Sequence, residues 1–308
     1  MFLGPNGLRA GWRLLIFVAL FLGASRAVRL VFSFLQLPGR GAVAMSWQFL
    51  LTVDAVGFAC ALAAAWVMSR IERRPVGVYG LPVRRAFGRN FWMGSFWGAV
   101  AISALVLAIR AAHGLTFDGP GLAPGAAMYY GALWLAGFIA VGLLEEFITR
   151  GYPLFTLTTG IGFWPAACVV SALFGLGHLG NPGEGWMGAS SAALIGLWLA
   201  LTLRRTGDLW FAVGFHALFD YGETFVYSVP NSGVSFQGQL LHTTLVGPRW
   251  ISGGSIGPEG SVFAFVMIAA LFLLFDRMYR RGRLPSAEPV ATGNRGEVGG
   301  AGRNRTDV

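Results

Sequence analysis

Four titratable side chains within apolar stretches are the residues of this sequence best suited to chemistry. Glu145 and Glu146 are adjacent at the end of one stretch, and two later stretches carry His178 and His216. An ionised side chain near the bilayer centre costs roughly 2.5–3.5 kcal/mol on insertion scales, so such residues are functional candidates by default. A carboxylate with two imidazoles can activate a water for attack on a carbonyl. The same groups can instead form a two-His, one-carboxylate zinc site. Both alternatives describe peptide-bond hydrolysis.

The spacing of the first motif divides its two glutamates. Glu146 and Arg150 are four residues apart, so on a helix the guanidinium can neutralise that carboxylate. Glu145 would then remain free for another task. The competing interpretation places both glutamates at a helix end in the headgroup region, where charge costs little.

The two histidines also lie in four-residue spacings. Phe174 precedes His178 by four positions, and His216 precedes Asp220 by four. Asp220 could therefore orient a histidine or another polar partner from the same helix face. A single histidine on an apolar helix is more often satisfied by packing and one hydrogen bond, but two of them beside a diglutamate favour a site.

Composition indicates a polytopic membrane protein. Of the 308 residues, 55% are hydrophobic and only 12% are charged, half the usual charged share of a soluble domain, and the mean hydropathy is +0.61. A transmembrane helix needs roughly 20 apolar residues. Eight stretches come close to this length: 12–34, 45–68, 91–109, 126–144, 161–178, 186–203, 209–227 and 261–275. We expect an all-α fold of about eight transmembrane helices with an intramembrane cavity for the active site.

The arginines indicate the orientation of these helices. A net charge of +9 would favour nucleic acid as the partner of a soluble protein, but here the arginines gather in alternate loops and in the C-terminal tail. The positive-inside rule then predicts a multi-pass protein of the cell membrane with both termini in the cytoplasm. Its partners are the lipid bilayer and a peptide or protein substrate, with no nucleic acid, and the oligomeric state is left open.

A helix that continues past the diglutamate would bring the motifs to one depth. If it ended at the glutamates, His178 would lie across the membrane from Glu145. The sequence stays largely apolar to Leu157, the first strong breakers are at 158–160, and Pro153 would at most kink the helix. With a turn near 160, Glu145 lies about 15 residues before it and His178 about 16 after it, at similar depth for ~1.5 Å per residue. The motifs can then converge in the inner half of the membrane.

The chain divides into four regions along these lines. The first stretch is either a retained helix, which we favour, or a signal peptide.

The Gly- and Ser-rich segment 228–260 is expected to be a long ordered outer loop. Glu184 and Glu223 flank the motif-bearing helices and lie either at the cavity mouth or in solvent. The expected regions are N-terminal helices with an Arg-rich cytoplasmic loop (1–124), the motif-bearing core (125–227), the outer loop and last helix (228–283) and a disordered cytoplasmic tail (284–308).

The three motifs together resemble the CPBP family of intramembrane proteases, which includes type II CAAX prenyl endopeptidases and bacteriocin-processing or immunity proteins. The family motifs EExxxR, FxxxH and HxxxN or HxxxD read here as EEFITR (Glu145–Arg150), FGLGH (Phe174–His178) and HALFD (His216–Asp220). Each motif is weak alone, and together on hydrophobic stretches they are fairly specific.

The resemblance implies a role for each motif residue. Glu145 matches the glutamate that activates the water, Glu146 and Arg150 match its supporting pair, and His178 and His216 match the active-site histidines. The same histidines with Glu145 are also candidate zinc ligands. The resemblance leaves zinc and a metal-free glutamate mechanism equally open.

Two further motif residues complete the candidate site. Phe174 is expected to support it. Asp220 is expected to be catalytic, although it occupies a place where the family most often has asparagine. An ionised aspartate cannot donate a hydrogen bond, whereas a protonated one can.

The resemblance predicts a membrane-embedded endopeptidase, glutamic or metallo, that cleaves a membrane-associated peptide or protein. The alternative is a non-catalytic scaffold or bacteriocin-immunity protein of the same fold. A proton-relaying transporter is a third alternative, but it offers no reason for the EExxxR spacing.

Overall fold

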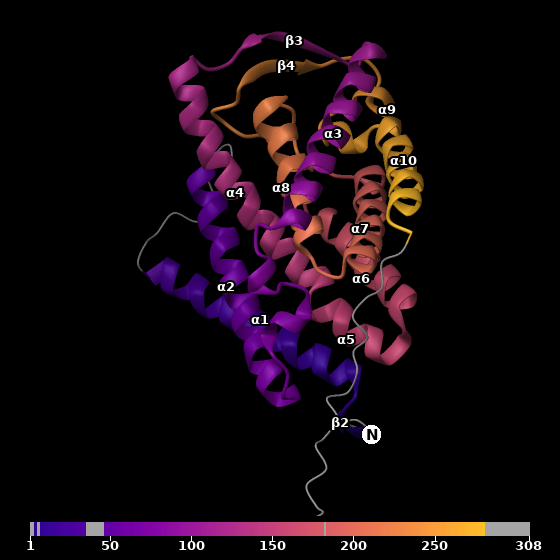
Figure 1. The fold of residues 1–308 in the computed structure, drawn as a ribbon. Helices are drawn as coiled ribbons and strands as arrows, with labels where there is room; N and C mark the ends of the chain where they lie inside the picture. Colours follow the sequence, from indigo (N-terminus) through magenta and orange to yellow (C-terminus); the bar gives the residue numbers. More distant parts are fainter. Residues whose placement is uncertain (1–2, 5–6, 35–45, 182, 281–308) are drawn as a thin grey trace, which may run out of the picture.

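The computed structural model describes residues 3–4, 7–34, 46–181 and 183–280. The tail expected at 284–308 lies outside these residues. The main helices run in chain order as α1 (Ala10–Phe34), α2 (Trp47–Glu72), α3 (Arg89–Ala111), α4 (Pro124–Arg150), α5 (Tyr152–Ile161), α6 (Phe163–His178), α7 (Trp186–Thr206), α8 (Trp210–Tyr221) and α10 (Val262–Met278). Figure 1 shows them as one bundle.

The helices agree with an all-α polytopic membrane protein, as the sequence predicts. Among the described residues, five stretches are long and apolar enough to cross a membrane: α1, α2, α3, the α4–α5 stretch Pro124–Ile161, and α7. The other three expected stretches correspond to α6, α8 and α10, which are shorter, with 16, 12 and 17 residues.

The helix that carries the diglutamate differs from the expectation at one point. It does extend the apolar run to Ile161, but it breaks at Gly151, where ψ is −122° and α5 begins. In an unbroken helix the Pro153 ring would clash with the carbonyl of Thr149, whereas in the first turn of a new helix it is tolerated. Pro153 therefore ends one helix and starts another, and does not merely kink it.

The segment 228–260 is more structured than the expected loop. It holds β4 (Leu241–Leu245), the short helix α9 (Arg249–Ser252) and the 3₁₀ turn η4 (Pro258–Gly260). The strand β4 pairs antiparallel with β3 (Leu115–Pro120), which precedes α4. These strands lie across one end of the bundle, at the top of Figure 1. We call this end the β3–β4 end and the opposite one the α5 end.

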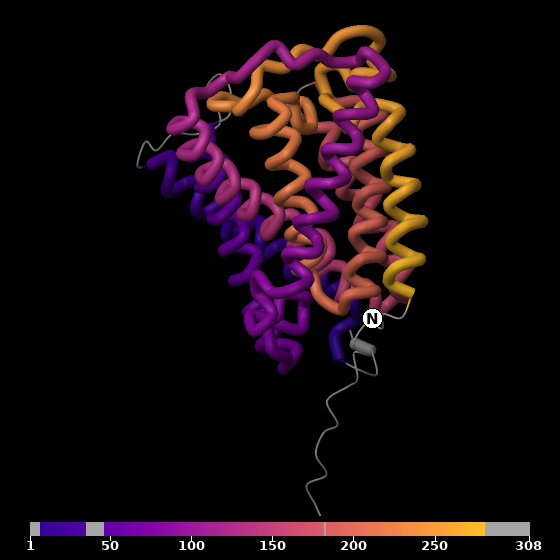
Figure 2. Tube along the Cα trace, turned by 45° about the horizontal axis from the view of Figure 1, so that its top comes forward, coloured from indigo at the N-terminus to yellow at the C-terminus, as the bar shows by residue number. Residues whose placement is uncertain are grey.

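The helix α8 is the centre of the packing and contacts α3, α4 and α7, as Figures 1 and 2 show. Glycines let α3 approach it backbone to backbone. A Cβ at Gly94 would lie 2.0 Å from the carbonyl oxygen of Phe211, and one at Gly214 would lie 2.1 Å from that of Phe91. Small residues at such crossings allow close helix packing in membranes. This packing fixes α8, which carries the last motif.

Two further elements complete the frame of the site. At the α5 end, Glu72 of α2 accepts hydrogen bonds from Arg13 of α1 and from the hydroxyl of Tyr152, which fastens α5 to the bundle. At the other end of α8, the chain continues as a π-helical turn, η3 (Gly222–Val226). A short pair, β1 (Leu3–Gly4) and β2 (Gly7–Leu8), precedes α1.

Candidate active site

One cavity inside the bundle brings the three motifs together. Its wall includes Glu145 of α4, His178 of α6, and His216 and Asp220 of α8. Mostly apolar residues of α2, α3, α4, α6, α7, α8 and α10 form the rest of the wall, together with Asp54 of α2 and residues of the segment 228–260 toward the β3–β4 end. The expectation that the motifs share a depth agrees with this arrangement.

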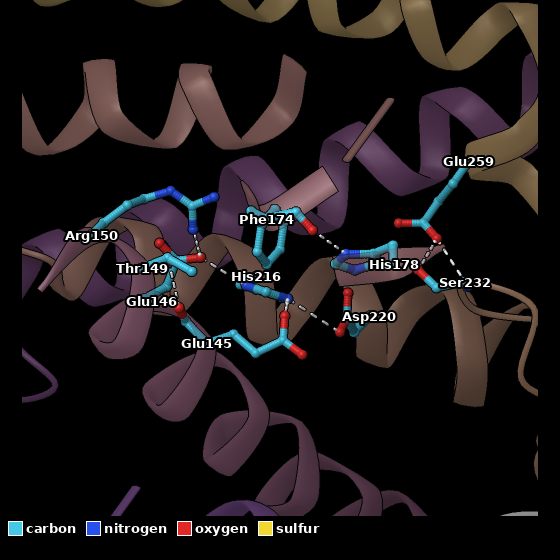
Figure 3. Close-up of polar contacts among 10 residues, drawn as sticks. All are labelled: Glu145, Glu146, Thr149, Arg150, Phe174, His178, His216, Asp220, Ser232 and Glu259. Atoms are coloured by element: carbon cyan, nitrogen blue, oxygen red, sulfur yellow. Dashed lines mark hydrogen bonds and ion pairs between the residues drawn. The ribbon is translucent and has the colours of Figure 1, made fainter. Parts of the chain in front are cut away.

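The carboxylate of Glu146 is fully buried and held on two sides. Arg150 Nη1 donates to its Oε1 at 2.6 Å, and both side chains have no exposed surface. The Nε of Arg150 donates to the carbonyl oxygen of Gly196 in α7 at 3.0 Å. Figure 3 shows this pair beside His216. A buried ion pair with such geometry fixes the position of the carboxylate more than it adds stability.

Phe174 explains why an aromatic residue belongs to the second motif. Its ring centroid lies 4.7 Å from the guanidinium carbon of Arg150, within the range of a cation–π contact. The same ring packs edge-on against the imidazole of His178, with 4.6 Å between centroids, and 6.4 Å from that of His216. The aromatic ring thus contacts both the buried arginine and His178, and links the second motif to the first.

His216 stands among three carboxylates. Its Nδ1 donates to Glu146 Oε1 at 2.9 Å, because an ionised carboxylate only accepts. On the other side of the ring, Nε2 lies 3.6 Å from Glu145 Oε2 and 3.5 Å from Asp220 Oδ2. Figure 3 shows these contacts in one layer. The arginine of the first motif therefore orients the histidine through Glu146, while Glu145 and Asp220 face the nitrogen on the cavity side.

His178 is fixed by its own helix. Its Nδ1 lies 2.8 Å from the carbonyl oxygen of Phe174, so it donates to that oxygen. The other nitrogen, Nε2, is then free to accept a hydrogen bond or, in a charged ring, to donate one. The described ion pairs contain none for His178, in contrast to His216.

The arrangement does not fit a zinc site. Within the described residues, no three His, Cys, Asp or Glu side chains are placed to hold a metal ion. His178, the second histidine that zinc would need, has none of the described ion pairs and donates its Nδ1–H to its own helix. We therefore derive no step through a metal.

The sequence reasoning missed polar residues at the β3–β4 end of the cavity. Glu259 of η4 lines the wall, as do Asn181, Asn231 and Ser232. Ser232 holds Glu259 through its backbone N–H at 2.9 Å and its hydroxyl at 2.6 Å. The only signal in the sequence was an acidic residue in a Gly-rich segment, which neither periodicity nor a motif places near the site.

Glu184 and Glu223, expected at the cavity mouth or in solvent, have different surroundings. Glu223 has no exposed surface, so it does not lie in solvent. Glu184 lies half-buried between α6 and α7. Burial, and next the nearby carboxylate of Glu259, raise the pKa of Glu184 to about 7, and His178 opposes this rise.

A comparison with protein families adds to this geometry. Residues 127–222 match the family model described as type II CAAX prenyl endopeptidase Rce1-like. No curated protein and no solved structure matches the chain. The matched segment runs from α4 to the end of α8 and contains all three motifs, but it ends before Glu223 and Glu259. At the level of the family, the match supports a CAAX-protease-like intramembrane endopeptidase. This match supports the assignment of the segment 127–222 to the CPBP family.

Proposed function

We propose that this protein is an intramembrane endopeptidase in which Glu145, without a metal ion, activates the water that attacks the peptide bond. One observation carries the proposal: the two adjacent glutamates have opposite surroundings. Glu146 is buried and occupied by Arg150 and His216, whereas the side chain of Glu145 is 31% exposed and faces the cavity. A general base must have access to the water it deprotonates, and only Glu145 has it.

The proposed step uses four groups that line one cavity. Glu145 takes a proton from water, the water oxygen bonds to the carbonyl carbon, and the C–N bond then breaks as the proton passes to the leaving nitrogen. His216 stands 3.6 Å from Glu145 Oε2 and orients it. His178 Nε2, when protonated, stabilises the oxyanion. Asp220 can donate to that oxyanion only as a neutral acid.

We also propose the orientation of the cavity in the cell membrane. Arg84 and Arg85, Arg204 and Arg205, and Arg277 lie on or beside elements that meet at the α5 end. The positive-inside rule then places this end in the cytoplasm. The cavity approaches the β3–β4 end, so the peptide would enter from the outer side of the membrane or from its outer leaflet.

The test is cleavage of a peptide library by purified protein in detergent micelles. Glu145→Gln should lower kcat/KM by about 10²–10⁴-fold, because it removes the general base and keeps the shape of the side chain. Asp276→Asn is the matched control, since Asp276 is a carboxylate outside the cavity that pairs with Arg205. Its activity should equal that of the wild type.

Metal content and activity are then measured on the same preparation. We expect activity to persist after chelation with zinc far below one equivalent. Stoichiometric zinc that is lost on His178→Ala would overturn the metal-free step. Library cleavage that Glu145→Gln leaves unchanged would reject Glu145 as the general base. A wild-type protein that cleaves no peptide would instead point to a non-catalytic scaffold or immunity protein.

A further inference from the structure

A second group of acidic side chains lies at the β3–β4 end of the cavity, and the proposed mechanism does not use it. Glu184 lies between α6 and α7, Glu223 in η3 and Glu259 in η4, so three separate segments supply the group. A Cβ on Gly188 would contact both Glu184 Oε1 and Ile256, and one on Gly257 would lie 3.4 Å from Glu223 Oε1, so both carboxyls lie beside the segment that carries Glu259. Glu259 acts electrostatically on both of them. We call these three residues the outer acidic group.

None of the described arginines is paired with this group, although the imidazole of His178 lies close enough to Glu184 to act on it. None of the described ion pairs contains Glu184, Glu223 or Glu259. Arg249, from the same segment as Glu259, donates to the hydroxyl of Ser255 instead. Neighbouring like charges without a counter-ion repel one another, and the repulsion is stronger away from bulk water. The group therefore has no arginine counter-ion among the described residues, and a bound cation would favour the ionised forms of its carboxyls.

Glu223 is the member of this group with the fewest partners. It has no exposed surface, and neither of its carboxylate oxygens has a hydrogen-bond partner among the described residues. Buried carboxylates normally have partners, and each exception needs an explanation. The surrounding turn is π-helical, a rare geometry found often at functional sites. Gly257 packs beside it: a Cβ there would lie 3.4 Å from Glu223 Oε1. The described protein thus places an unpaired carboxylate behind the cavity wall.

Glu259 connects this group to the active-site cavity. It lines the same cavity as Glu145 and His216. Ser232 binds only its Oε2, which leaves Oε1 for another donor. Figure 3 shows Glu259 on the far side of His178 from the Glu146–Arg150 pair. A ligand in the cavity can therefore meet both the reactive layer and the outer acidic group.

We propose that the outer acidic group is a subsite for a positively charged side chain, arginine or lysine, of the peptide substrate near its scissile bond. This inference rests on the proposed function. Glu259 makes the direct contact, while Glu184 and Glu223 lie behind it as carboxyls whose ionised forms a bound cation would favour. The apolar stem of a basic side chain suits the apolar wall, and its charged end forms a charge-assisted bond with the carboxylate. A metal ion is a poorer occupant, because the described carboxylates are not placed to hold one.

Binding to a non-cleaving protein tests the subsite. The probe is a set of apolar peptides with one arginine at each position in turn, paired with peptides that carry neutral citrulline at the same position. On the Glu145→Gln protein, at least one arginine peptide should bind about tenfold tighter than its citrulline partner. Adding Glu259→Gln should bring this ratio near one, and adding Glu184→Gln should lower it less. Adding Asp118→Asn, an exposed carboxylate on β3, should leave the ratio unchanged.

The outcomes separate this subsite from the proposed function. Equal binding of arginine and citrulline peptides at every position would overturn the subsite even if Glu145-dependent cleavage is found. An arginine preference that depends on Glu259, in a protein that cleaves nothing, would uphold the subsite and reject the endopeptidase. Equal losses for both peptides in Glu259→Gln would show a structural role and reject the subsite. If Glu259→Gln does not fold, the test uses Glu184→Gln: a lowered preference for the arginine peptide over its citrulline partner upholds the subsite, and an unchanged preference rejects it.

Discussion

The two ends of the cavity hold buried carboxylates in contrasting surroundings. Near the α5 end, Glu146 binds Arg150 at 2.6 Å and His216 at 2.9 Å, all within one connected set. Near the β3–β4 end, Glu223 is equally buried but neither oxygen has a partner among the described residues. Burial of a carboxylate is costly in both places. Only at the α5 end does the fold itself offset that cost.

The paired and the unpaired carboxylate suit two different functions in one cavity. A paired carboxylate is fixed in position, which suits a group that must orient a histidine before the substrate arrives. An unpaired carboxylate keeps its capacity to bind and lowers the stability of the empty protein, which suits recognition of a cation. Variants that remove one partner at a time should therefore act differently at the two ends.

The largest effect is expected when the paired end loses its cation. Arg150→Met leaves Glu146 buried without its counter-ion and should lower the free energy of unfolding by about 3–5 kcal/mol. Unfolding in micelles, followed by circular dichroism against denaturant, measures it. Arg249→Met, which removes an arginine bound to Ser255 near the surface, is the control and should change little.

A double variant sharpens this result. Arg150→Met with Glu146→Leu removes both buried charges, so it should regain much of the lost stability. It should remain inactive, because His216 loses the carboxylate that orients it. A loss below about 1 kcal/mol in Arg150→Met alone would contradict the view that this pair is closed to water.

The paired end was also the part that the sequence could predict. Glu146 and Arg150 lie one helical turn apart on a single helix, so their contact needs only local geometry. The helices were predictable because crossing a bilayer requires long apolar runs. The convergence of Glu145, His178 and His216 followed from counting residues on either side of a turn near 160.

The unpaired end depends on long-range folding that leaves no pattern in the sequence. Glu259 reaches the cavity only because η4 folds over it and Ser232 binds its carboxylate. Glu223 turns inward on a π-helical turn, which has no periodic signature. The break at Gly151 was missed for a related reason: a proline inside an apolar run permits either a kink or a new helix. In this protein the chain starts a new helix, α5, and the hydrogen bond from Tyr152 to Glu72 fastens that helix to the bundle.

An intermediate effect, of opposite sign at the two ends, is expected from matched isosteric changes. Glu146→Gln loses charge-assisted bonds and should lower the free energy of unfolding by about 2–3 kcal/mol. Glu223→Gln loses no described hydrogen bond and replaces a buried carboxyl that has no described partner, so stability should stay equal or rise by about 1 kcal/mol. The same denaturant titration measures both. If Glu223→Gln costs as much as Glu146→Gln, the two ends do not differ as argued.

The smallest effect is a pH dependence confined to the unpaired end. The pKa of Glu184 rises from its ordinary value of 4.5 to about 7, first through burial and then through Glu259. Between these values the folded protein holds a proton that the unfolded chain has released. Stability therefore falls as pH rises from about 4.5 to 7, and the contribution of the protonated group is fully present only below this window.

Glu184→Gln should remove the fall in stability between pH 4.5 and 7. The free energy of unfolding of wild type minus that of the variant, measured from pH 5 to 8, separates the contribution of Glu184 from those of other titrating groups. Glu259→Gln should move the window toward lower pH, because it removes the neighbouring charge and leaves burial in place. Glu72→Gln, at the α5 end, should leave the window where it is. An unchanged pH profile in Glu184→Gln would show that this carboxyl is ionised throughout, and that the repulsion at the β3–β4 end is balanced by a cation already in place.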